Sequence, residues 1–189
     1  MSTAKTARRS VRGLDVSRTA LLGTLAAAAL VATGVVWAIR PVEPLPAGMK
    51  ADLLVVDKSA RRLSVYSHGT LVRSYRVSLG REPVGPKRRQ GDSRTPEGRY
   101  VIDHHNPASE FHLALHVSYP SPADTARALA VGYSPGGDIM VHGMRNGLGW
   151  IGHAHLLVDW TIGCVAVTDS EIEELYRVVP DGTPIEFRP

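Results

Sequence analysis

From residue 52 onward, short apolar runs alternate with turns that are rich in glycine, proline and charge. Three such runs follow one another closely: DLLVVD at 52–57, LSVYS at 63–67 and TLVRSYRVSL at 70–79. Runs of this length with many β-branched and aromatic residues predict strands, and the short connections between them predict a β-meander. YVID at 100–103 and FHLALHVSY at 111–119 predict two further strands.

The segment between these two groups of strands, GREPVGPKRRQGDSRTPEGRY at 80–100, predicts a long loop because it is rich in glycine, proline and charge. Its basic cluster KRR at 87–89 is typical of a solvated surface, and a ligand-binding role is the alternative. His112 and His116 would share one face of the strand expected at 111–119. This pattern favours exposed polar positions on a half-buried strand over a metal site.

Two helices carry local capping signals. Ser121 followed by Pro122 provides an N-cap and a first helical residue for ADTARALAV, and Thr168 with Glu171 forms a capping box ahead of IEELYRVV. The short apolar runs DIMVHG and PIEF predict additional strands. Residues 52–189 are therefore expected to form a mainly β domain of the α+β class with two short helices.

The first 40 residues follow a different pattern. TALLGTLAAAALVATGVVWAI at 19–39 contains no charge, and as a helix it would reach about 30 Å, enough to cross a bilayer core. The basic arm at 1–18 predicts that the N-terminal side stays in the cytoplasm. An uncleaved single-pass signal anchor is favoured, with the domain on the extracytoplasmic (periplasmic) side of the cytoplasmic membrane. A cleaved signal peptide, which would make the protein secreted, is the alternative.

Composition and charge narrow the function classes. With 43% hydrophobic and 21% charged residues the chain has the composition of a globular protein. The formal net charge of +4 comes from the basic N-terminal part, so the rest of the chain is nearly neutral and a nucleic-acid partner is not expected. A proline-rich linker at 40–51, including PVEPLPAGMK, separates the anchor from the domain at 52–189.

Cys164 is the single cysteine of the chain, so it has no partner for an internal disulfide. A lone thiol outside the cytoplasm is a liability unless its reactivity is used; the alternative is a small core residue. His142 ends one apolar strand and Cys164 begins another, each beside a glycine, Gly143 and Gly163. If the two strands are neighbours, the pair would meet at one rim of the sheet, with backbone N–H groups around Gly163 and Cys164 forming an oxyanion hole. Such a pair suits acyl transfer through a thioester.

The motifs GDSRTPEGRY at 91–100, IMVHG at 139–143 and TIGCVAVT at 161–168 occur in an order that resembles the L,D-transpeptidase catalytic domain family (YkuD-type), in its YafK-like branch. The resemblance extends from residue 52 to 189 and implies an L,D-transpeptidase-like β-sandwich or barrel. It also implies roles for three groups of residues. These are Cys164 as nucleophile, His142 as general base and acid oriented by the carbonyl of Gly143, and Thr161 and Gly163 of the cysteine motif at the oxyanion or substrate. His155, in the insert at 144–160, is expected to be a structural or substrate-side residue.

By this resemblance the protein is an enzyme that acts on peptidoglycan stem peptides without a metal or organic cofactor. Cys164 would form a thioester at an L,D bond, and an amine or water would then resolve it. An amine acceptor gives a cross-link or attaches a cell-wall-linked protein, whereas water gives hydrolysis. Two departures from the family pattern leave this choice open: Ile162 stands where histidine is frequent, and Ala166 where arginine or asparagine is frequent.

Two rival functions belong to other classes. A zinc peptidoglycan hydrolase would use His153 and His155, expected on one face of a strand, with His142 as third ligand, although the chain lacks a helical H-E-x-x-H site. A non-catalytic peptidoglycan-binding module would keep the fold and tolerate Cys164→Ser. The insert at 144–160 contains NGLGW, which predicts a flexible lid over the site.

Overall fold

The computed structural model describes residues 43–189, and its elements follow the apolar runs of the sequence. The meander is confirmed as three antiparallel strands: β1 (Leu53–Asp57), β2 (Arg62–Ser67) and β3 (Thr70–Arg76). Five further strands are β4 (Gly98–Asn106), β5 (Ala114–Val117), β6 (Met140–His142), β7 (Val165–Ala166) and β8 (Pro184–Arg188). The long segment between β3 and β4 forms a loop, as its composition predicts.

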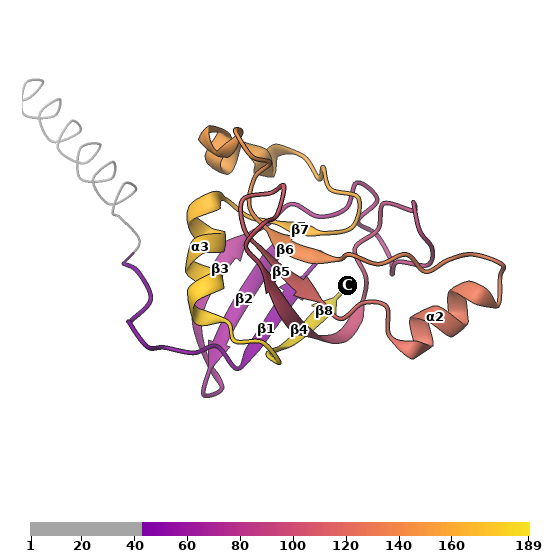
Figure 1. The fold of residues 1–189 in the computed structure, drawn as a ribbon, viewed down its shortest axis with the longest axis horizontal. Helices are drawn as coiled ribbons and strands as arrows, with labels where there is room; N and C mark the ends of the chain where they lie inside the picture. The colour runs from indigo at the N-terminus through magenta and orange to yellow at the C-terminus, as the bar shows by residue number, and fades with distance from the viewer. Residues whose placement is uncertain (1–42) are drawn as a thin grey trace, which may run out of the picture. The chain divides into compact units, whose positions relative to one another are not determined.

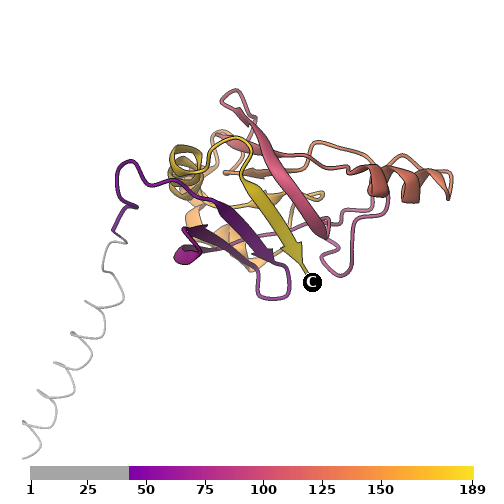
Figure 2. The same cartoon turned by 90° about the horizontal axis from the view of Figure 1, so that it is seen from below.

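All eight strands belong to one sheet in the order β3-β2-β1-β8-β4-β5-β6-β7. β1 pairs parallel with β8, and β6 pairs parallel with β7, whereas the other neighbours are antiparallel. The sheet curls, as Figures 1 and 2 show, and Ser78 after β3 bridges Ala166 in β7, so its two ends are joined. The expected sandwich or barrel is therefore a single curled sheet that nearly closes on itself.

The two predicted helices are present, with the predicted caps. α2 (Pro122–Leu129) and α3 (Asp169–Val178) both begin with a capping box, at Ser121 and Thr168. α3 lies along the flank of the sheet and buries Ile172, Leu175 and Val178, whereas α2 stands away from the sheet (Figure 1). A third helical element was not predicted: the insert contains the 3₁₀ segment η1 (Gly149–Leu157), which is interrupted at Gly152.

The histidines expected on one strand face are separated. β5 begins at Ala114, and His112 precedes it with a φ of 65°, which takes it out of the strand alternation. His112 instead places its Nε2 2.8 Å from Glu173 Oε1 in α3. The spacing was misleading because the strand is shorter than its apolar run.

The predicted basic arm at 1–18 and anchor helix at 19–39 lie outside the described residues. Within 43–189, no helix has both the length and the apolar character to cross a membrane. Pro44–Pro189 forms one compact unit.

Candidate active site

The pairing of β6 with β7 brings Cys164 and His142 to one side of the sheet. His142 is registered opposite Ala166, and Cys164 comes directly before β7, so the pairing places the two segments that carry these residues side by side. Both line one cavity of about 1030 Å³. The strands are neighbours as predicted, but they are parallel. The register of two very short strands, rather than a shared rim, therefore brings both residues to one cavity.

The imidazole of His142 is buried, with 3% of its surface exposed, and has a defined orientation. Its Nδ1 lies 2.7 Å from the carbonyl oxygen of Gly143. A carbonyl only accepts, so Nδ1 donates and Nε2 carries the lone pair. The ring packs against Phe111, with 4.5 Å between centroids, and meets Trp160 edge-on at 5.8 Å. Burial lowers the pKa of His142 to about 4, opposed by the Gly143 hydrogen bond, so the ring is neutral at pH 7.

A tight turn from Thr161 to Cys164 presents the thiol. The buried hydroxyl of Thr161 donates to the carbonyl of Cys164 at 2.8 Å and accepts from the N–H of Gly163 at 3.1 Å. Gly163 has a φ of +142°, and a Cβ there would lie 2.8 Å from the carbonyl oxygen of Arg94. The residue before the cysteine must therefore be glycine.

The hydrogen bond from Gly163 changes the expected oxyanion hole. The sequence predicts N–H groups around both Gly163 and Cys164 as oxyanion donors, but the structure commits the N–H of Gly163 to the Thr161 hydroxyl. An oxyanion at this thiol would therefore have to use the N–H of Cys164 itself or a donor from elsewhere in the cavity. In the described structure Thr161 and Gly163 build the turn.

The thiol of Cys164 lies beside the strand that carries the histidine. Its Sγ is 3.5 Å from the carbonyl oxygen of Asp138, in the segment that leads into β6. Burial raises the pKa of Cys164 to about 11, while a hydrogen bond from the Met140 N–H and the charge of Lys87 act in the opposite direction. The thiol is therefore protonated at neutral pH.

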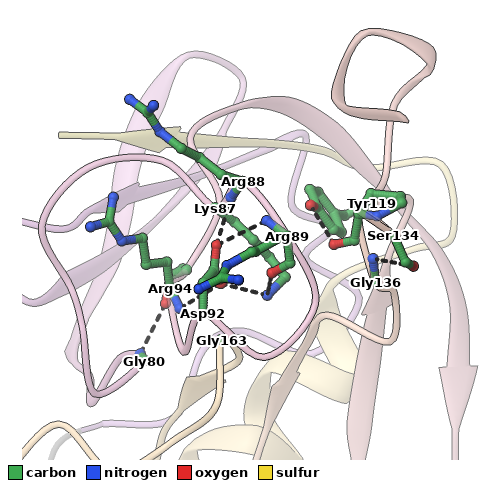
Figure 3. A network of polar contacts seen from close by, with 12 residues as sticks. Gly80, Lys87, Arg88, Arg89, Asp92, Arg94, Tyr119, Ser134, Gly136 and Gly163 are labelled. Atoms are coloured by element: carbon green, nitrogen blue, oxygen red, sulfur yellow. Dashed lines mark hydrogen bonds and ion pairs between the residues drawn. The ribbon is translucent and has the colours of Figure 1, made fainter. Parts of the chain in front are cut away.

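The loop between β3 and β4 forms another wall of the cavity, and Figure 3 shows that Asp92 organises it. The Asp92 carboxylate accepts hydrogen bonds from the N–H groups of Arg88, Arg89 and Arg94, and it pairs with Lys87 Nζ at 2.9 Å. Burial alone would raise the pKa of Asp92, but these hydrogen bonds outweigh it and lower the pKa. The prediction of a solvated cluster is wrong for Lys87, which is 5% exposed, although Arg88 and Arg89 are exposed.

His155 lies in η1, lines the cavity and is 5% exposed. The indole N–H of Trp160 lies 3.4 Å from its Nδ1 and can only donate, so Nδ1 accepts and the proton sits on Nε2. Within residues 43–189, Nε2 has no hydrogen-bond partner. Burial is the main cause that lowers the pKa of His155, so the ring is a neutral donor.

The rival zinc arrangement, with His153 and His155 as ligands, is not formed. The two residues lie in the 3₁₀ segment rather than on a strand, and His153 is exposed and pairs with Glu171 at 3.2 Å. In the described part of the chain, the three residues that place ligand atoms at metal-binding spacing are Asp103, His104 and His116, which do not line the cavity.

Among the cavity residues that the sequence did not point to, Phe111, Asp138 and Trp160 contact His142 or Cys164. Trp160 had a signal, because it directly precedes Thr161 in the cysteine motif. Phe111 and Asp138 had none, since they approach His142 and Cys164 only through the pairing of β5, β6 and β7.

Comparisons with known proteins identify the family to which the chain belongs. A family model of the L,D-transpeptidase catalytic domain (YkuD) matches residues 51–187. YafK of Escherichia coli K12, whose name assigns it to the L,D-transpeptidases, is 30% identical over 130 residues, or 66% of this chain and 45% of YafK. The helical cell shape determining protein Pgp2 from Campylobacter jejuni has a similar structure, with a TM-score of 0.57, 23% identity, and coverage of 75% of this chain and 48% of Pgp2.

An L,D-transpeptidase structure from Xylanimonas cellulosilytica aligns with a TM-score of 0.50 and 16% identity, covering 78% of this chain and 65% of that one. The chain spans about half the length of YafK and Pgp2, and the structural likenesses establish the fold alone. The family match covers most of the chain and all three sequence motifs. The chain therefore belongs to the L,D-transpeptidase catalytic domain family.

Proposed function

We propose that this protein is a peptidoglycan-modifying enzyme that transfers acyl groups of stem peptides through Cys164, with His142 as general base and acid. The observation that carries this proposal is the hydrogen bond from His142 Nδ1 to the Gly143 carbonyl. It leaves Nε2 able to accept a proton, in a ring that lines the same cavity as the thiol. Family membership supports the substrate class.

Burial sets the resting protonation of the pair. The pKa of Cys164 is raised to about 11 and that of His142 is lowered to about 4, so both groups are neutral at pH 7. A resting thiolate–imidazolium pair would require two desolvated charges. The proton therefore moves from Sγ to Nε2 as the sulfur attacks, which makes His142 a general base in the first step.

The reaction has two halves. Cys164 Sγ attacks the carbonyl carbon of an L,D peptide bond, and its proton passes to His142 Nε2. The oxyanion collapses, the C–N bond breaks, and the D-residue leaves as an amine that takes the proton from His142. An acceptor amine or water then attacks the thioester and gives its proton to His142, which returns it to the departing sulfur.

The donors around the carbonyl have separate tasks in this proposal. Because Gly163 donates to Thr161, the oxyanion would be bound by the N–H of Cys164, and Thr161 would hold that N–H in place. The unpartnered Nε2–H of His155 supports a substrate-side role, as a neutral donor to a carbonyl or carboxylate oxygen of the stem peptide.

The proposed location of the protein rests on the sequence alone. The uncharged run at 19–39 would anchor the protein in the cytoplasmic membrane and hold the domain outside it, next to peptidoglycan. A cell-wall-linked protein is a candidate acceptor or substrate. The runner-up function is a hydrolase of the same family, in which water resolves the thioester.

The test uses the full-length chain and a defined tetrapeptide muropeptide, with and without an acceptor amine, and mass spectrometry of the products. Wild type should release the terminal D-residue, and the acceptor arm separates a cross-linked product from a hydrolysed one. Cys164→Ala and His142→Gln should lose turnover while Cys164→Ala retains the wild-type melting temperature. Undiminished turnover by Cys164→Ala would refute the nucleophile. A binding module without activity would instead retain muropeptide binding in Cys164→Ser.

A further inference from the structure

We propose that Asp103, His104 and His116 form a binding site for a divalent transition metal, with Zn²⁺ as the best fit. Each residue places one ligand atom within 4.8 Å of the other two. The Nδ1 atoms of His104 and His116 lie 2.9 Å and 2.6 Å from the same oxygen, Asp103 Oδ1. This site lies outside the active-site cavity and does not depend on the proposed reaction.

The pairing of β4 with β5 brings these three side chains together. His104 is registered directly opposite His116, and their rings stack with centroids 4.4 Å apart. Consecutive residues of a regular strand point to opposite faces, so Asp103 would normally face away from His104. The register shift between Ile102 and His104 breaks this alternation. A bulge of this kind re-aims a side chain, which here directs the carboxylate towards both imidazoles.

The ligand set and spacing match the preferences of zinc. Two imidazole nitrogens and one carboxylate oxygen, with an open position for water, are ligands that Zn²⁺ accepts in tetrahedral sites. Zn–N and Zn–O bonds of about 2.0–2.2 Å place neighbouring tetrahedral ligands about 3.3 Å apart. The present separations of 2.6 Å and 2.9 Å would open by about half an ångström. The side chains are 37%, 56% and 15% exposed for Asp103, His104 and His116, so an ion can reach them from solvent.

The carboxylate of Asp138 lies close to His116, where a hydrogen-bond acceptor for a metal-bound histidine is expected. Metal on Nδ1 of His116 would require the proton on Nε2, and metal-bound histidines usually donate that proton to a carboxylate. Nε2 of His116 faces Asp138 Oδ1 at 4.0 Å, and the Asp138 side chain is exposed and able to approach. The carbonyl of the same Asp138 lies 3.5 Å from Cys164 Sγ. An occupied site would therefore orient the segment that borders the thiol.

The experiment is calorimetric titration of ZnCl₂ into the metal-free, untagged full-length chain. Saturable binding of one Zn²⁺ per chain is expected in wild type, with an affinity loss of about tenfold or more in Asp103→Asn, His104→Ala and His116→Ala. Asp138→Asn should weaken binding less than loss of a ligand does. Melting temperatures identify variants that fail to fold.

Two controls exclude other ligands. Cys164→Ser should bind Zn²⁺ like wild type, which separates this site from metal captured by the active-site thiol. His112→Ala removes a comparable surface histidine–carboxylate pair, with Glu173, and should also leave binding unchanged. Absence of saturable binding in wild type, or equal binding in the folded Asp103→Asn/His116→Ala double variant, would overturn the proposal. Loss of binding in Cys164→Ser would overturn it too.

Discussion

Burial of His142 makes the stability of the fold depend on pH in a specific window. The ring is 3% exposed, and burial lowers its pKa from 6.5 to about 4. Between these two values the unfolded chain binds more protons at this residue than the folded chain does. Stability therefore falls as pH decreases through the window. From the two pKa values, His142 alone accounts for a loss of about 2 kcal/mol between about pH 7 and pH 5.

Urea unfolding followed by circular dichroism, at several pH values in this range, measures the effect in wild type and His142→Gln. Glutamine does not titrate, so the free energy of unfolding of the variant lacks this contribution. All other titratable groups are common to both chains, so the difference in stability reports chiefly on His142. The stability of wild type relative to the variant should fall by about 2 kcal/mol on acidification. If the free energy of unfolding fell equally in wild type and in His142→Gln, the fold would not hold His142 neutral. The proposed resting state, with His142 and Cys164 both neutral, would then be wrong.

Two further predictions concern the turn that carries the thiol. Thr161→Val leaves the buried N–H of Gly163 without its acceptor, so the free energy of unfolding in denaturant should fall by about 1–3 kcal/mol. Turnover should also drop, and Thr161→Ser should restore both stability and turnover. Gly163→Ala forces a Cβ to within 2.8 Å of the Arg94 carbonyl oxygen at a positive φ, with an expected cost of at least about 1–3 kcal/mol. Gly137→Ala, where a Cβ would meet no atom within 4 Å, is the matched control and should leave stability nearly unchanged.

The features predicted correctly from sequence are those fixed by neighbouring residues. The helix starts were identified from Ser121 followed by Pro122 and from Thr168 with Glu171, which are residues at most three apart, and the structure confirms both caps. The strands of the meander are likewise delimited by the turns between them. The parallel pairing of β1 with β8 joins segments from opposite ends of the domain, and no local pattern encodes it. The geometry of Cys164 and His142 depends on such a non-local pairing, between β6 and β7.

Lys87 illustrates a second limit of prediction from the sequence. A run of three basic residues in a loop rich in glycine and proline is typical of a solvated surface, and two of the three are exposed. Lys87 is buried because the loop closes around Asp92, five residues further along the chain. The Asp92 carboxylate accepts one hydrogen bond from the Lys87 ammonium group and three from backbone N–H groups of the loop. The acid was visible in the sequence. Nothing in the sequence indicated that the loop folds back on itself, since that depends on its packing against the sheet.

Ile162 and Ala166, the two departures from the family pattern, act at different places in the fold. Ile162 lines the cavity and is 70% exposed, so it would form part of the wall that an acceptor meets in the proposed reaction. Ala166 is fully buried, is absent from the cavity wall, and lies beside His142 in the parallel pair. In the proposed reaction, the missing polar group at 166 would therefore affect how His142 is positioned, whereas the residue at 162 would affect which acceptor reaches the thioester. The choice between amine and water should accordingly respond to substitution of Ile162 and not of Ala166.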